Sequence, residues 1–70
     1  MDGRIYRKVL GQNVSSFRKK LGYSQEKLAE KAQLHWTYVS DIERGRRNPS
    51  LQTIVRLAMA LNRKPFELIK

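Results

Sequence analysis

The sequence predicts an all-α protein, a compact five-helix bundle in a single domain that spans residues 1–70. Apolar residues recur at helical spacings of three and four along most of the chain. Ser24 and Ser50 stand where helices should begin, and Gly22 and Gly45 stand where helices should end. With 40% hydrophobic residues, 70 residues can form one thin core but leave no room for a second domain or an effector pocket.

The first helix is predicted from about Lys8 to Gly22. Its apolar stripe consists of Leu10, Val14, Phe17 and Leu21. Residues 1–7 precede it and carry two arginines around Ile5 and Tyr6. We interpret this segment as a frayed terminus, and a flexible basic arm is the alternative.

Residues 24–45 are typical of two short helices joined by a tight turn at residues 32–34. Leu28, Ala29 and Ala32 share one face of the first of these helices. The second, residues 35–44, turns Val39 and Ile42 inward. Counting about 100° per residue, its opposite face collects Thr37, Ser40, Asp41 and Arg44, with Trp36 on the flank. A polar face of this kind can enter the major groove of duplex DNA and distinguish base edges.

A fourth helix should follow Ser50, with one apolar side that we expect in the core: Leu51, Ile54, Leu57, Ala58 and Leu61. Pro65 suits the first position of a last short helix ending at Lys70. Phe66, Leu68 and Ile69 are more apolar groups than so short an end can cover. We therefore expect some of them to pack on the first helix and the others to form a homodimer interface.

Charge and composition limit the classes of partner. Fifteen Lys and Arg against six Asp and Glu give a net charge of +9, which favours nucleic acid or an anionic surface. Arg44, Arg46 and Arg47 cluster beside Asn48, where they can contact phosphates. The sequence contains no cysteine, which suits a reducing cytoplasm. The longest apolar run, residues 57–61, is too short to span a membrane.

At this point the sequence resembles a known family, the phage-repressor-like (lambda repressor and Cro-like) helix-turn-helix regulators, which include the controller proteins of restriction-modification systems. The resemblance runs from about Val9 to Ile69, nearly the whole chain. The residues that carry it are Arg18, Gly22, Ser24-Gln25, Leu28-Ala29, Tyr38-Val39-Ser40, Ile42-Glu43-Arg44-Gly45, Arg47-Asn48-Pro49-Ser50-Leu51 and Leu57-Ala58. As a linked set these residues are highly specific.

The resemblance assigns further roles. It implies that an ion pair between Arg18 and Glu43 ties the first helix to the recognition helix, and the angular count also places Glu43 inward. It implies a phosphate contact by Gln25 at a helix N-terminus. Gln33 departs from the family pattern, which commonly has Gly at this turn because the backbone there tends toward positive φ. Trp36 departs as well, since similar proteins usually have a polar residue at this first reading position.

Three of these residues keep alternative interpretations. Trp36 either packs across the groove between the helices or lies against deoxyribose or a thymine methyl group. His35 either caps the recognition helix or contacts a phosphate, and no second ligand is spaced for a metal. Asp41 either accepts a hydrogen bond from a cytosine amino group or pairs with Arg44 within the helix.

Taken together, these features predict a sequence-specific, double-stranded DNA-binding transcription regulator. We expect a dimeric repressor or self-controlling regulator on a pseudo-palindromic operator. The alternative is a protein-binding module, such as an antitoxin or a scaffold, that uses the same fold. Scattered carboxylates, one histidine and the lack of a phosphate-cradling Gly loop give no reason to expect an enzyme, a cofactor, a metal or a small-molecule ligand.

Overall fold

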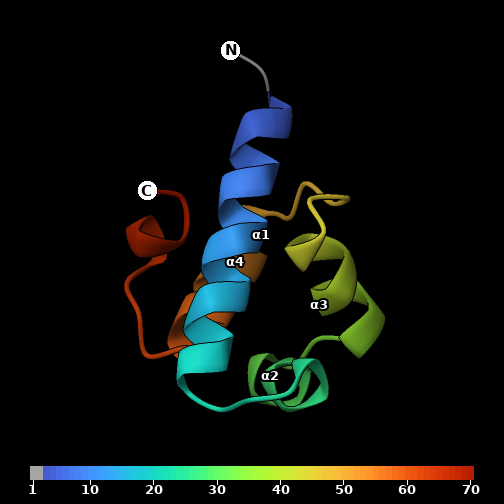
Figure 1. Ribbon diagram of the computed structural model, residues 1–70, viewed down its shortest axis with the longest axis vertical. Helices are drawn as coiled ribbons and strands as arrows, with labels where there is room; N and C mark the ends of the chain where they lie inside the picture. Colours follow the sequence, from blue (N-terminus) through green and yellow to red (C-terminus); the bar gives the residue numbers. More distant parts are fainter. Residues whose placement is uncertain (1–2) are drawn as a thin grey trace.

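The computed structural model describes residues 3–70, and these residues form four α-helices and one short 3-10 helix (Figure 1). The all-α prediction is confirmed, with no strand in the described part of the chain. The molecule measures 32 × 22 × 20 Å along its principal axes. In chain order the elements are α1 (Gly3–Lys20), α2 (Gln25–Ala32), α3 (Trp36–Glu43), α4 (Leu51–Ala60) and the 3-10 helix η1 (Pro65–Leu68).

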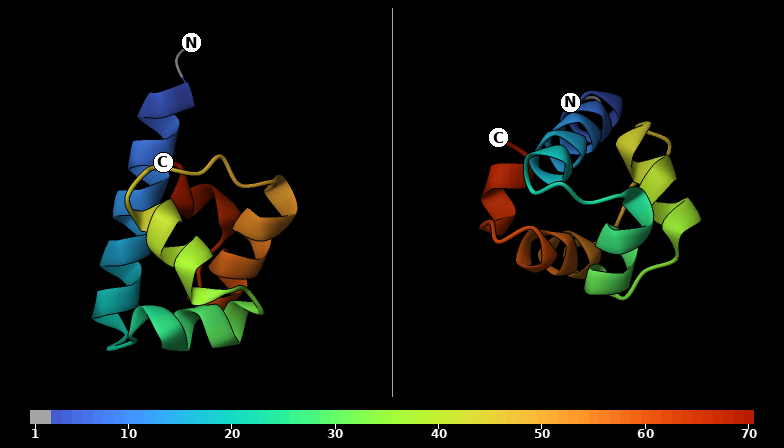
Figure 2. Two further views of the ribbon diagram at one scale, coloured as in Figure 1. Left: turned by 90° about the vertical axis from the view of Figure 1, so that its right-hand side faces the viewer. Right: turned by 60° about the horizontal axis from the view of Figure 1, so that its bottom comes forward.

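The long helix α1 is the axis around which the other elements are arranged. α2 lies across the C-terminal end of α1, and α3 and η1 lie on opposite sides of it (Figures 1 and 2). α3 packs against both α1 and α2, while η1 packs against α1 and α4. The helix-turn-helix pair is therefore supported from behind by α1, which packs on α3, and by α4, which packs on α2, and the outer side of α3 is left open.

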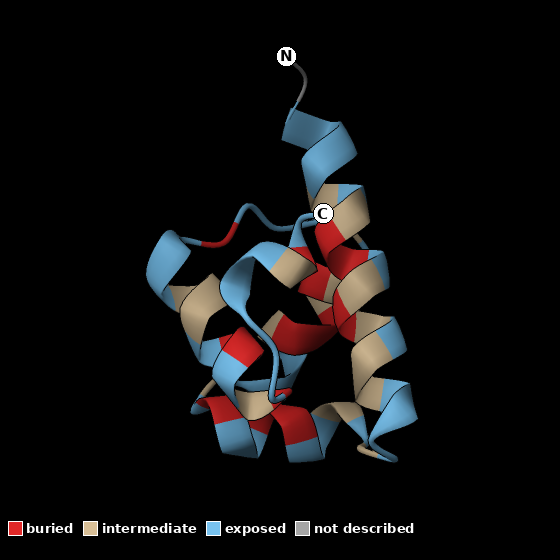
Figure 3. Ribbon diagram, turned by 90° about the vertical axis from the view of Figure 1, so that its left-hand side faces the viewer, coloured by how far each residue is buried: buried red, intermediate tan, exposed pale blue. Residues whose placement is uncertain are grey.

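The N-terminal segment differs from its prediction. Residues 3–7 belong to α1 and form neither a frayed end nor an arm, while Met1 and Asp2 lie outside the described residues. No proline interrupts the chain between Gly3 and Lys8, so the helix continues toward the N-terminus. These first turns project beyond the rest of the molecule, and Ile5 and Tyr6 are exposed there (Figures 1 and 3).

Serine side chains start two helices as the sequence predicts. Ser24 Oγ accepts a hydrogen bond from the Lys27 backbone N–H at 2.9 Å, and Ser50 Oγ accepts one from the Thr53 N–H at 3.2 Å. Each bond satisfies a backbone donor that lacks a partner within its own helix. The positions of α2 and α4 along the chain are thus set by local hydrogen bonding.

The tight turn between α2 and α3 passes through Gln33 in the left-handed conformation, with φ 58° and ψ 44°. Its backbone N–H reaches the carbonyl oxygen of Glu30 at 3.2 Å, and the N–H of Leu34 reaches that of Ala29 at 2.9 Å. These two bonds close the end of the helix in the pattern that usually has glycine at this place. The positive φ expected at Gln33 is therefore present.

Replacing Gln33 with glycine should stabilise the protein by about 1 kcal/mol, because glycine adopts positive φ without the steric cost of a Cβ atom. The measurement is the urea midpoint of unfolding at an unchanged slope. Gln33→Ala is the matched control and should leave the midpoint nearly where it is. A Gly variant no more stable than the Ala variant would show that the turn is not strained.

The core lies between the inward faces of the helices (Figure 3). Most predicted core residues are buried and Phe17 and Ile54 are half-buried, but two are exposed: Leu51 is 73% exposed and Leu21 is 41% exposed. Both leucines lie at helix ends. The helical spacing of apolar residues therefore placed them on the correct face of the helix, but no neighbouring helix covers them there. The buried apolar residues are Leu10, Val14, Leu28, Ala29, Ala32, Val39, Ile42, Leu57, Ala58, Leu61 and Leu68.

The C-terminal end is a single 3-10 turn that stops at Leu68, whereas the short helix predicted there continues to Lys70. Pro65 is the first residue of this turn. The backbone N–H groups of the turn bond to carbonyl oxygens three residues earlier, as in the bond from the Glu67 N–H to the Lys64 carbonyl oxygen at 2.9 Å. Asn13 on α1 fixes this end, because its Nδ2 donates to the Leu68 carbonyl oxygen at 2.9 Å. Among the described residues, no helix is long and apolar enough to cross a membrane.

Candidate nucleic-acid interface

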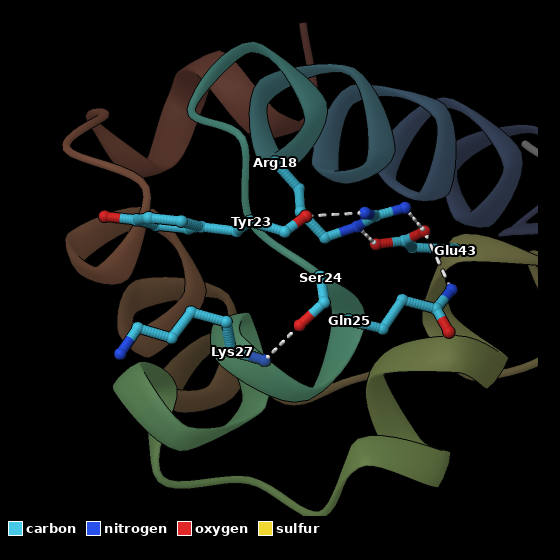
Figure 4. A network of polar contacts seen from close by, with 6 residues as sticks. All are labelled: Arg18, Tyr23, Ser24, Gln25, Lys27 and Glu43. Atoms are coloured by element: carbon cyan, nitrogen blue, oxygen red, sulfur yellow. Dashed lines mark hydrogen bonds and ion pairs between the residues drawn. The ribbon is translucent and has the colours of Figure 1, made fainter.

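Arg18 and Glu43 join α1 to the end of α3 (Figure 4). Arg18 Nε donates to Glu43 Oε2 at 2.7 Å, and Arg18 Nη2 donates to Glu43 Oε1 at 3.0 Å. The third donor, Nη1, reaches the Tyr23 carbonyl oxygen at 2.8 Å. The side chains of Arg18 and Glu43 are only 12% and 6% exposed, so the two charges neutralise each other largely out of water.

Gln25 extends this network into α2. Its Nε2 donates to Glu43 Oε1 at 3.0 Å, while its amide oxygen points away from the carboxylate (Figure 4). One carboxylate near the end of α3 is thereby bonded to α1 through Arg18 and to the first residue of α2 through Gln25. The network holds the three helices at one relative orientation.

A close backbone approach between α1 and α3, which sequence reasoning missed, occurs at Gly11. A Cβ atom built on Gly11 would lie 2.5 Å from the Ile42 carbonyl oxygen and 2.7 Å from that of Glu43. Only a residue without a side chain allows the two helices to touch here. The signal in the sequence was weak, because a glycine within an apolar helical pattern predicts only a lower helix propensity.

The first turn of α3 is organised by His35. Its Nδ1 accepts a hydrogen bond from the Thr37 backbone N–H at 3.2 Å and lies 2.7 Å from the Thr37 hydroxyl oxygen. His35 therefore caps the helix, and it also fixes the direction of the Thr37 hydroxyl. Trp36 stacks on the His35 ring with centroids 6.3 Å apart and remains 50% exposed, so it does not pack into the core.

Four residues were predicted to read bases on α3, and they differ in exposure. Trp36 and Thr37 are exposed and Asp41 is half-buried, but Ser40 is only 6% exposed. The placement of Ser40 on the outer face was wrong. α3 packs against two helices at once, so the buried arc is wider than the stripe that Val39 and Ile42 define.

Asp41 forms an ion pair, but its partner is Arg47 and not Arg44. Arg47 Nε lies 3.3 Å from Asp41 Oδ2, and the Arg47 guanidinium lies over the Tyr38 ring at 5.1 Å from the ring centroid. The alternative pairing with Arg44 within the helix is not formed, and the loop after α3 returns along the helix surface to bring Arg47 to Asp41. The role of Tyr38 was also missed from the sequence.

Gly45 makes this return of the loop possible. It has φ +73°, a conformation that glycine adopts without strain. The Arg46 backbone N–H then donates to the Asp41 carbonyl oxygen at 2.9 Å, which fastens the loop to α3. The side chains of Arg44, Arg46 and Asn48 are exposed, so the end of α3 and the following loop present hydrogen-bond donors to solvent.

The arrangement is a short helix with an exposed polar face, held by two other helices and flanked by arginines. Hydroxyl, carboxylate and guanidinium groups on such a face can bond to base edges, and the flanking donors can bond to phosphates. The described residues include no group of three or more metal-ligating side chains. This geometry defines the class of DNA-reading helix-turn-helix proteins.

The helix-turn-helix family model matches residues 14–68, so the chain belongs to the helix-turn-helix family of DNA-binding transcription regulators. The family is not one of enzymes, as the sequence predicts. A similar protein is the control protein C.BamHI of Bacillus amyloliquefaciens, 48% identical over 64 residues, which cover 90% of this chain and 79% of that protein. The control protein C.SmaI of Serratia marcescens is 46% identical over 56 residues, 80% of this chain and 67% of that protein.

Solved structures show the same relationship. The restriction-modification controller protein C.AhdI from Aeromonas hydrophila superposes with a TM-score of 0.86 at 44% identity, covering 89% of this chain and 94% of that one. The biofilm regulator SinR in complex with DNA superposes with a TM-score of 0.83 at 37% identity, covering 87% of this chain and 98% of that one. The predicted resemblance to controller proteins and repressor-like regulators is thus confirmed.

Proposed function

We propose that this protein is a cytoplasmic, dimeric repressor or self-controlling regulator that binds a pseudo-palindromic DNA operator. The observation that carries the proposal is the exposed polar face of α3, which the Arg18–Glu43–Gln25 network holds beside an arginine-rich loop. A fixed helix with this chemistry meets the geometric requirement for reading the major groove. The net charge of +9 supplies attraction to any duplex.

Within this proposal, exposed side chains at the start of α3 face the bases. The Thr37 hydroxyl, whose proton is directed to His35 Nδ1, can accept a hydrogen bond from a base edge, and the half-exposed Trp36 ring can lie against a thymine methyl group or a sugar. Asp41 lies one turn further along the helix. Ser40 is left out of the reading set because it is buried.

The DNA backbone is held by groups around this face. Gln25 keeps one amide N–H beyond the bond to Glu43, and it stands at the first turn of α2, where backbone N–H groups favour an anion. The exposed arginines after α3 supply charge. The proposed backbone set is Gln25, His35, Arg44, Arg46 and Asn48.

We place the dimer interface at the C-terminal end, on the side of α1 opposite α3 (Figure 1). Phe66 and Ile69 are 56% and 46% exposed, whereas Leu68 is completely buried in its own subunit and is removed from the interface predicted from the sequence. A small groove of about 70 Å³ begins at Ile69 and extends past Tyr6 to Pro49 and Asn48 in the loop after α3. A second subunit bound here would leave both recognition helices free.

Replacing Phe66 with serine should weaken self-association at least tenfold, because an exposed aromatic ring contributes most when an interface covers it. Sedimentation at micromolar concentration should show a dimer for the wild type and a monomer for the variant. Met59→Ser is the matched control, since Met59 is 72% exposed and lines a different groove with Tyr23 and Lys31. Equal association of all three proteins would contradict the proposed interface.

Selection of bound sequences from randomised duplex DNA tests the function directly. The wild type should select two similar half-sites in inverted orientation, with centres about one helical turn, or 34–36 Å, apart. Selection of a single unrepeated half-site would argue for a monomer. Failure to select any sequence would contradict the regulator and favour a protein-binding role for the same fold.

A further inference from the structure

We propose that Asp41 is a positioning residue for Arg47, and that the Arg47 guanidinium reads a guanine in the operator. The proposal rests on the DNA-binding function proposed above and assigns Arg47 to a base in place of the phosphate contact predicted from the sequence. It also changes the role of Asp41, which then selects a base pair through Arg47 and not through its own bond to cytosine.

The first support is the way in which Arg47 is held. Its Nε lies 3.3 Å from Asp41 Oδ2, and its guanidinium carbon lies 5.1 Å from the centre of the Tyr38 ring. Stacking on an aromatic face fixes the plane of the guanidinium, and the bond to Nε fixes its rotation within that plane. A side chain that only neutralises a phosphate needs neither restraint, because a phosphate can be met from many directions.

The second support is the set of donors that remains. Within residues 3–70, no acceptor contacts Nη1 or Nη2 of Arg47, and the side chain is 55% exposed. These two nitrogens form the outer edge of the planar fork, whose geometry matches the O6 and N7 acceptors of guanine in the major groove. The restraint on Nε therefore leaves free the edge that guanine requires.

The third support is the position of the pair on the molecule. Asp41 and Tyr38 belong to α3, and Arg47 is brought to them because Gly45 turns the loop back and the Arg46 N–H bonds to the Asp41 carbonyl oxygen at 2.9 Å. Arg46, the neighbour in sequence, is exposed and makes no side-chain ion pair in the described part of the chain. The two arginines thus have the same charge and different degrees of restraint.

The test compares Arg47→Lys, Asp41→Ala, the double variant and the control Arg46→Lys on the duplex that the wild type selects. Affinity is measured for that duplex and for each of its single base-pair substitutions. Lysine keeps the positive charge but lacks the two parallel donors of the guanidinium. Arg47→Lys should therefore reduce, by about tenfold, the preference for one G·C pair over the other base pairs at that position. Asp41→Ala should relax the same pair, and the double variant should lose no more than Arg47→Lys alone.

The control Arg46→Lys should keep the discrimination profile, even where its changed phosphate contact alters the affinity for every duplex alike. Thermal unfolding should be similar for all variants because both members of the Asp41–Arg47 pair keep contact with solvent. An unchanged profile for Arg47→Lys would overturn the proposal and return Arg47 to a phosphate. Relaxation of a different base pair by Asp41→Ala would overturn it as well, since Asp41 would then read its own base. A wild type that selects no sequence would overturn the proposed function itself, a result seen before any variant is made.

Discussion

Replacing Arg18 with alanine should lower the free energy of unfolding by about 3 kcal/mol or more, the usual cost of removing one partner from a buried ion pair. The reason lies with Glu43, whose side chain is 6% exposed and would keep only the Gln25 amide as a partner. The Tyr23 carbonyl oxygen would lose a donor as well. Urea unfolding monitored by circular dichroism measures the change.

Two controls separate the ion pair from general effects of charge. Lys19→Ala removes an exposed positive charge from the next position on α1 and should change stability by less than about 0.5 kcal/mol. The double variant Arg18→Met with Glu43→Leu removes both charges and should recover part of the loss, because no unpaired carboxylate remains. Equal urea midpoints for Arg18→Ala and Lys19→Ala would show that the pair does not stabilise the fold.

Replacing Gly11 with alanine should destabilise the protein by about 2 kcal/mol, within the usual range for overpacking. The added Cβ would meet the carbonyl oxygens of Ile42 and Glu43 at 2.5 and 2.7 Å, so the end of α3 would have to move away from α1. This cost opposes a gain of about 1 kcal/mol in helix propensity. The displaced α3 should also bind DNA more weakly.

Gly3 supplies the matched control for that prediction. It lies at the start of the same helix, and a Cβ there would meet only the Arg7 side chain at 3.7 Å. Gly3→Ala should therefore be neutral or slightly stabilising, and its DNA affinity should equal that of the wild type. If Gly11→Ala is equally well tolerated, the two helices can separate at no cost and the close contact does not set the position of α3.

Much of the fold could be predicted because its determinants are local. Ser24 and Ser50 form hydrogen bonds within their own first turns, and the positive φ of Gln33, which the family resemblance implies, depends only on the end of one helix. The spacing of Leu28 and Val39 placed both in the core, where they are fully buried. Such features follow from neighbours three or four residues away, which the sequence itself displays.

The failures concern contacts between distant segments. Ser40 is buried because α3 fits between two helices, and Leu51 is exposed because no element covers the start of α4. Asn13 bonds to a carbonyl oxygen 55 residues away. Asp41 pairs with Arg47 only after Gly45 reverses the chain. No periodicity within one helix contains this information.

The central claim, that the outer face of α3 reads bases while exposed donors such as Arg46 in the following loop hold phosphates, is tested most directly by the salt dependence of DNA affinity. The measurement compares wild type, Thr37→Ala and Arg46→Ala on the selected operator and on an unrelated duplex. Arg46→Ala should weaken binding to both duplexes alike and reduce the slope of log affinity against log salt by about 0.9.

Thr37→Ala should keep the slope and lose affinity only for the operator, by about 1 kcal/mol or more at one base pair. The two variants would then differ in kind, because phosphate contacts set affinity for any duplex and base contacts set the choice among duplexes. If Thr37→Ala and Arg46→Ala instead change the slope equally and leave the ratio of operator to unrelated affinity unchanged, α3 does not read bases in this protein.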